Sequence, residues 1–173
     1  LRPQSPAQFI QVLEESGLIV EVGGWVLAEA CHFCSRLLAD GLVDGERFSL
    51  CVNISPRQFR QHDFVERVAS SLRDSQLPNA MLKLEITEGI VIQNIDDTVG
   101  KMLRLKKHGV SFAMDDFGTG YSSLTYLKRL PVDMLKIDQS FVHDATNDPN
   151  DAEIIRAIIA MARSLGLALI AEG

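Results

Sequence analysis

The stretch Val110-Ser111-Phe112-Ala113-Met114-Asp115-Asp116-Phe117-Gly118-Thr119-Gly120 is an apolar strand pattern that ends in two carboxylates and a glycine-rich turn. Four other apolar runs end on polar groups, at Asn53, at Glu85, at 136–138 and at Glu172. The gaps between these ends are about thirty residues, roughly the length of one strand-plus-helix unit. Acid, amide and lysine groups at the same end of successive strands converge at the mouth of a barrel. That arrangement suits a site for a divalent metal and a phosphate ester better than a packed core.

Strand and helix patterns alternate along the whole chain. The predicted strands cover residues 48–54, 81–87, 110–115, 132–137 and 167–171, with helical patterns between them. This order predicts a parallel α/β architecture, either an open doubly wound sheet or a (β/α)8 barrel. An open sheet gathers its site mainly at the switch in strand order, whereas barrel enzymes use many strand ends at one face. Because every strand end carries a polar group here, we favour the (β/α)8 TIM-like barrel.

The length of the chain bears on this prediction. A full barrel takes about 250 residues, and the sequence has 173. We therefore predict a single domain over residues 1–173 that corresponds to a TIM-like barrel truncated at both ends.

Composition limits the classes of partner and location. The chain is 46% hydrophobic and 23% charged, which is typical of a globular domain. Its net charge of -6 argues against a polymeric nucleic-acid partner, while a small phosphate ligand remains possible because metal ions supply positive charge locally. No apolar run approaches the roughly 20 residues of a membrane helix. The odd number of cysteines, three, predicts a reducing cytoplasm.

Taken one at a time, the polar groups have structural explanations. An aspartate before a glycine-rich turn usually caps a helix or forms the turn, and Lys136 alone would be a surface lysine. Glu85 and Glu88 could start a helix on a solvated face. A structural account of all five strand ends would need five coincidences, so we favour a functional site. The Cys-x-x-Cys pair at 31–34 lies mid-helix on an apolar face without a second pair, and we assign it to the core.

Five motifs in order resemble the EAL domain, the bacterial family of cyclic di-GMP phosphodiesterases. They are Val52-Asn53-Ile54-Ser55, Leu84-Glu85-Ile86-Thr87-Glu88, Asp115-Asp116-Phe117-Gly118-Thr119-Gly120-Tyr121-Ser122-Ser123, Lys136-Ile137-Asp138 with Ser140-Phe141-Val142, and Ala171-Glu172-Gly173. The resemblance covers essentially the whole chain, although the Glu-Ala-Leu motif that names the family is not in this sequence.

The resemblance implies a site with two divalent metal ions, Mg²⁺ or Mn²⁺. Asn53, Glu85 and Asp115 would hold the first ion, and Asp115 would bridge to a second ion held by Asp116 and Glu172. Hard ions of this kind prefer carboxylate and carbonyl oxygens. Two such ions about 3.5–4 Å apart neutralise phosphoryl charge and lower the pKa of a bound water from 15.7 towards about 7.

The resemblance also implies catalytic roles for Lys136, Glu88 and Asp138. Lys136 would orient or help to activate the attacking water, Glu88 would support the loop after Asp116, and Asp138 would line the same site. The implied reaction is hydrolysis of cyclic di-GMP to the linear dinucleotide pGpG.

Two other functions stay open, and neither of them involves catalysis. One is a catalytically inactive receptor that binds cyclic di-GMP. The other is a regulatory module, with residues 117–126 as a candidate contact between two copies. We expect a homodimer, fused to GGDEF or sensory domains in the full protein, which would be cytoplasmic with membrane tethering left open.

Overall fold

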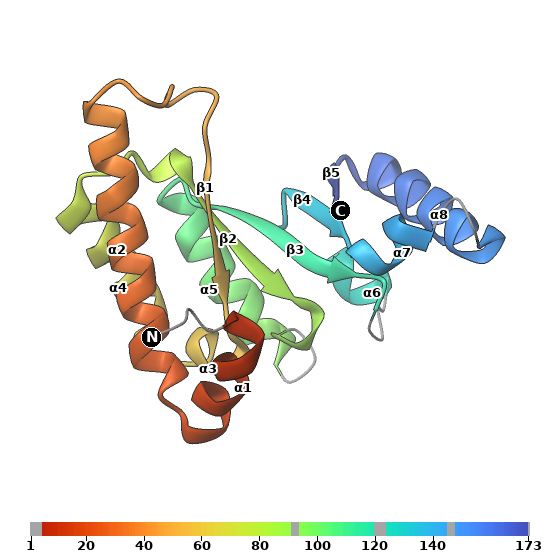
Figure 1. Ribbon diagram of the computed structural model, residues 1–173, viewed down its shortest axis with the longest axis horizontal. Helices are drawn as coiled ribbons and strands as arrows, with labels where there is room; N and C mark the ends of the chain where they lie inside the picture. Colours follow the sequence, from red (N-terminus) through yellow and green to blue (C-terminus); the bar gives the residue numbers. More distant parts are fainter. Residues whose placement is uncertain (1–4, 91–93, 120–123, 145–147, 173) are drawn as a thin grey trace. The chain divides into compact units, whose positions relative to one another are not determined.

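The protein is described by a computed structural model that covers residues 5–90, 94–119, 124–144 and 148–172 (Figure 1). The chain divides into two compact units, with the boundary between Leu82 and Lys83. Four residues of the glycine-rich turn, 120–123, and the final glycine of the last motif lie outside the described residues.

The first unit consists of helices around one strand. Its elements are α1 (Pro6–Ser16), α2 (Ile19–Ala39), β1 (Leu50–Ile54), α3 (Pro56–Phe59), α4 (Phe64–Ser75) and the 3₁₀ turn η1 (Asn79–Met81). The long helix α2 contacts α4, α3 and β1. Its buried residues include Leu27, Cys31 and Cys34. Both cysteines are free. Burial is the larger cause and the charge of the neighbouring Cys34 the smaller cause that together raise the pKa of Cys31 to about 11. The core assignment of this cysteine pair is confirmed.

The second unit alternates strands and helices. Its elements are β2 (Leu82–Thr87), η2 (Glu88–Ile90), α5 (Ile95–Lys107), β3 (Ser111–Phe117), α6 (Leu124–Leu127), β4 (Met134–Ile137), α7 (Gln139–Asp144), α8 (Pro149–Leu165) and β5 (Ala168–Ala171). Strands β2 to β5 pair in chain order and all three pairings are parallel. The predicted parallel α/β architecture is therefore confirmed.

The strands of the second unit separate an apolar face from a polar one. Side chains alternate between the two faces of a strand, and Leu84 and Ile86 on β2 are fully buried. Helix α5 contacts β3, while α8 contacts β4 and β5. Glu85 and Lys136 project from the opposite face, as their place in the alternation requires. This polar face carries the candidate site.

The strand ends differ from the predicted ones by one or two residues, and two helices also differ from the prediction. The apolar pattern predicts a helix from about Gly24 to Leu38, whereas α2 already begins at Ile19, directly after the turn at Gly17, where α1 ends with φ of 82°. Helix α7, between β4 and α8, was not predicted. Among the described helices, none combines the length and apolarity needed to span a bilayer.

Candidate active site

Lys136 is the centre of a cluster of carboxylates in the second unit. Its Nζ lies 2.9 Å from Glu85 Oε2, 2.9 Å from Asp115 Oδ1 and 2.5 Å from Glu172 Oε1. These acids come from β2, from β3 and from the residue after β5, so all four strands of the unit contribute. The parallel register produces this meeting, since it aligns the ends of neighbouring strands.

The environment of Lys136 keeps this side chain positively charged. Its side chain is 11% exposed, and those of Glu85 and Asp115 are 8% and 12% exposed. Burial by itself lowers the pKa of Lys136, but the hydrogen bonds that its ammonium donates to Glu172, Glu85 and Asp115 outweigh burial and raise the pKa above its usual range. A lysine with a raised pKa does not accept a proton near neutral pH. A charged ammonium group suits the predicted role of orienting the attacking water, which stays a prediction.

A bulge in β3 explains how two consecutive aspartates serve one site. Met114 pairs with Leu135, but the next pairing joins Phe117 to Ile137, which leaves one extra residue in β3. Asp116 takes the left-handed conformation, with φ of 52°, and its N–H donates to Asp115 Oδ1 over 3.1 Å. In a regular strand the two side chains would point to opposite faces; a bulge redirects one of them.

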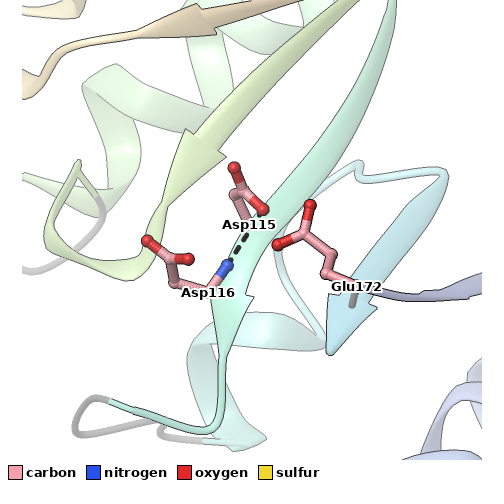
Figure 2. Close-up of side chains that lie close together, drawn as sticks. All are labelled: Asp115, Asp116 and Glu172. Atoms are coloured by element: carbon pink, nitrogen blue, oxygen red, sulfur yellow. Dashed lines mark hydrogen bonds between the residues drawn. The ribbon is translucent and has the colours of Figure 1, made fainter. Parts of the chain in front are cut away.

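The bulge completes a group of three carboxylates that suits a cation. One oxygen each of Asp115, Asp116 and Glu172 lies within 4.8 Å of the others. Figure 2 shows Asp115 and Asp116 projecting from β3, with the carboxylate of Glu172 directed towards Asp115. Carboxylate oxygens are the ligands that hard divalent ions prefer, so the residues present fit a magnesium or manganese ion.

Asp116 and Asp138 have opposite electrostatic environments. Burial, the charge of Asp115, a hydrogen bond to Asp138 and the charges of Asp138 and Glu172 raise the pKa of Asp116. Hydrogen bonds from the hydroxyl and N–H of Ser140 lower the pKa of Asp138. Asp116 is therefore the more readily protonated of the two carboxylates. Ser140 was not assigned a role from the sequence, although its position two residues after an aspartate is typical of a side chain-to-backbone turn.

Glu88 and the turn after Asp116 are in direct contact. Gly118 donates its N–H to Glu88 Oε1 over 3.3 Å. Gly118 has φ of 105°, and a Cβ there would lie 3.0 Å from Phe141 Cε2 and 3.4 Å from Ile158 Cδ1. Only glycine fits both the backbone conformation and the space against α7 and α8.

The Gly118→Ala substitution should destabilise the protein and weaken the site. The positive φ and the contact with Phe141 together should lower the free energy of unfolding by about 1–3 kcal/mol. Urea denaturation measures this change. Gly100→Ala is the matched control, because a Cβ at Gly100, within α5, meets nothing within 4 Å, and we expect it to be neutral or slightly stabilising. Equal stability of the two variants would contradict the prediction.

The structure brings together six of the eight residues predicted for the site. Glu85, Asp115, Lys136 and Glu172 are joined by the ion pairs of Lys136, and Asp138 lies near enough to Asp116 to raise its pKa. Glu88 contacts the adjoining turn. Asn53 belongs to the first unit, where it is exposed at the fourth position of β1; its assignment as a metal ligand stays a prediction.

Comparison with known proteins identifies the family. A model of the EAL domain family matches residues 2–173, and the chain belongs to this family. The chain is 41% identical over 169 residues to the bifunctional diguanylate cyclase/cyclic di-GMP phosphodiesterase MucR of Pseudomonas aeruginosa, covering 98% of the chain and 24% of MucR. It is 42% identical over 168 residues to the cyclic di-GMP phosphodiesterase NbdA of the same organism, covering 97% of the chain and 21% of NbdA.

Solved structures agree with this assignment. A structure of the PaMucR phosphodiesterase in complex with c-di-GMP has a TM-score of 0.92 and 40% identity, covering 99% of this chain and 70% of that one. A manganese/cy-diGMP complex of Klebsiella pneumoniae BlrP1 has a TM-score of 0.77 and 26% identity, covering 89% of this chain and 38% of that one. The predicted fold class, the α/β TIM-like barrel of EAL domains, is thus confirmed. The chain spans about a quarter or less of the curated relatives it matches.

Proposed function

We propose that this domain hydrolyses cyclic di-GMP to linear pGpG in a reaction that depends on divalent metal. The observation that carries the proposal is the Lys136 cluster, in which one buried ammonium group meets three carboxylates from neighbouring strand ends. A purely structural ion pair would need one acid, whereas three or more acids around one cation suit a centre that also binds metal. The names of MucR and NbdA support cyclic di-GMP as the substrate.

The proposed metal ligands are those of the family pattern. Asn53, Glu85 and Asp115 would hold one ion, and Asp115, Asp116 and Glu172 the other. When bound, the ions would neutralise charge on the phosphoryl oxygens and lower the pKa of a coordinated water. Because carboxylates repel each other at this density, the site is electrostatically prepared for added positive charge.

The side chains of the protein would have separate tasks around that centre. Lys136, charged throughout the physiological pH range, would donate a hydrogen bond to the attacking water and keep its lone pair directed at phosphorus. The Asp116 N–H fixes the rotamer of Asp115, and Glu88 holds the turn that follows. Asp138 would line the same site as an ionised carboxylate, since hydrogen bonds from Ser140 lower its pKa.

Chromatography of cyclic di-GMP incubated with the purified protein tests the proposal. We expect linear dinucleotide to form with Mg²⁺ or Mn²⁺ and not with a chelator. Glu85→Gln should reduce turnover by about 1,000-fold, because it removes a proposed ligand and a partner of Lys136. The matched control is Glu153→Gln, on an exposed glutamate of α8 whose side chain is 71% exposed, and we expect it to retain wild-type turnover.

Two other results would redirect the assignment. Tight binding of cyclic di-GMP without turnover would identify an inactive receptor. Turnover that persists in Glu85→Gln would contradict the role given to Glu85 and leave the substrate assignment intact.

Partners and location follow from the same family pattern. We propose a homodimer, neighbouring GGDEF or sensory domains in the full-length protein, and a cytoplasmic site of action. The bifunctional name of MucR supports the fused cyclase. The predicted contact segment 117–126 includes four residues outside those that the structure describes.

A further inference from the structure

Asp133, the residue before β4, connects three strands. Its N–H donates to the carbonyl of Phe112 over 2.9 Å, and its Oδ2 accepts from the Phe112 N–H over 2.9 Å. Its carbonyl accepts from the N–H of Ala168 over 3.0 Å. Both backbone polar groups of Phe112, in β3, and the first N–H of β5 are therefore bound to one residue.

Lys106, in the last turn of α5, fixes the carboxylate of Asp133. Its Nζ lies 2.5 Å from Asp133 Oδ1 and 3.2 Å from the carbonyl of Pro131. The lysine thus holds the rotamer that directs Oδ2 at Phe112 and also holds the segment that leads into β4. The Lys106 and Asp133 side chains are 31% and 39% exposed, so the ion pair itself adds little stability.

The three strands held by Asp133 carry the core of the site. Asp115 lies three residues after Phe112, Lys136 three residues after Asp133, and Glu172 four residues after Ala168. At about 3.3 Å per residue, the hydrogen bonds of Asp133 lie roughly 10 Å along the strands from the carboxylates. A displacement of the strands at Asp133 is therefore transmitted along this short distance to the carboxylates of the site.

Strand β4 is short, and its register with β3 changes at the bulge. It contains four residues, and only Ala113 with Met134 and Met114 with Leu135 are paired before the bulge. A slip of one residue would turn Lys136 to the opposite face of the sheet.

We infer that Asp133 is a positioning residue that sets the register of β3, β4 and β5 and so holds Lys136 between Asp115 and Glu172. Its effect on turnover rests on the proposed function, whereas its effect on the sheet does not. Misplacement of a reacting group by 1 Å can reduce a rate by about 100-fold. Loss of Asp133 should therefore affect kcat far more than stability.

Four variants test the inference. Asp133→Ala removes both side-chain contacts, and we expect kcat to fall by about 30-fold or more while KM changes by less than about twofold. Asp133→Asn retains an oxygen acceptor for Phe112 and should recover most of the loss. Lys106→Met keeps the carboxylate but frees its rotamer and should give an intermediate kcat. Asp96→Ala is the control, because Asp96 forms an exposed ion pair with Arg129 that involves none of the three strands.

Amide hydrogen exchange provides a readout that needs neither metal nor substrate. We expect the Phe112 amide to exchange about tenfold faster or more in Asp133→Ala and at the wild-type rate in Asp96→Ala. If the wild-type protein has no turnover, the proposed function fails, and exchange at Phe112 still decides whether Asp133 sets the register. If Asp133→Ala does not fold, Asp133→Asn and Lys106→Met are compared in the same exchange assay. The inference expects the Phe112 amide to exchange faster in Lys106→Met than in Asp133→Asn. Wild-type exchange at Phe112 in both Asp133→Ala and Lys106→Met, or wild-type kcat in Asp133→Ala, overturns the inference.

Discussion

The Lys136→Met variant is expected to lose at least about 1,000-fold in turnover and, without metal, about 3 kcal/mol in the free energy of unfolding. The loss of turnover follows from removing the charged donor proposed to orient the water. The loss of stability has a separate cause. Removing the ammonium leaves Glu85, Asp115 and Glu172 together in a largely buried site without a cation. Removal of one partner of a buried ion pair lowers the free energy of unfolding by more than the intact pair adds, because the remaining charge is buried and uncompensated.

Divalent metal should restore stability to Lys136→Met while turnover stays low. A cation that binds the three carboxylates replaces the missing positive charge, so Mn²⁺ should raise the urea midpoint more in the variant than in the wild type. Lys101→Met is the matched control: Lys101 is also a buried lysine, paired with Asp97 at 2.9 Å on α5. We expect no extra metal effect there. A metal-free Lys136→Met as stable as the wild type would show that the cluster does not depend on this charge.

The stability deficit of Lys136→Met should not depend on pH across the neutral range. The pKa of Lys136 is raised in the folded protein, so its stabilising contribution is complete below the unfolded pKa of about 10.4. The contribution is lost only as pH rises through the folded value, which is higher still. Urea denaturation at pH 6 and pH 9 should therefore give the same difference between variant and wild type.

The sequence located the site because strands were followed by polar residues at regular intervals. Glu85, Asp115, Lys136 and Glu172 each follow an apolar run, and parallel pairing was enough to predict their meeting. The existence of these strands was predictable from their hydrophobic periodicity. Their predicted ends were wrong by one or two residues, because the last hydrogen bond of a strand depends on a pairing partner that is distant in sequence.

The bulge in β3 could not be predicted in the same way. Period-2 alternation implies that Asp115 and Asp116 face opposite sides of the sheet, and nothing local marks the extra residue. Helix α7 was missed for a related reason. Its six residues, Gln139–Asp144, are too few for a helical period to stand out, and the α8 segment that it contacts lies further along the chain. The role of Asp133 needed the pairing partners Phe112 and Ala168 to be known.

Asp116→Asn should raise the stability of the metal-free protein at pH 7 and reduce turnover by at least about 100-fold. Burial and the neighbouring carboxylates make the charged form of Asp116 unfavourable, as its raised pKa indicates. A neutral amide removes this repulsion, can donate to Asp138 and tolerates the positive φ of residue 116. The same change removes a proposed metal ligand. A gain in stability with a loss of activity is the result expected of a site whose charges serve binding.

Asp138→Asn is the matched comparison, and the two variants should differ in sign. Asp138 has a lowered pKa, so its charge stabilises the folded protein above the unfolded pKa of about 3.9, and that contribution is lost as pH falls through the lower, folded value. The Asn variant should therefore be less stable at pH 7. For Asp116 the folded pKa is raised, so the advantage of Asp116→Asn is largest above that folded pKa and is lost as pH falls below the unfolded pKa of about 3.9. Urea midpoints at about pH 3 and pH 7 measure both effects. Equal shifts of the same sign in the two variants would refute the opposed electrostatic environments of these two carboxylates.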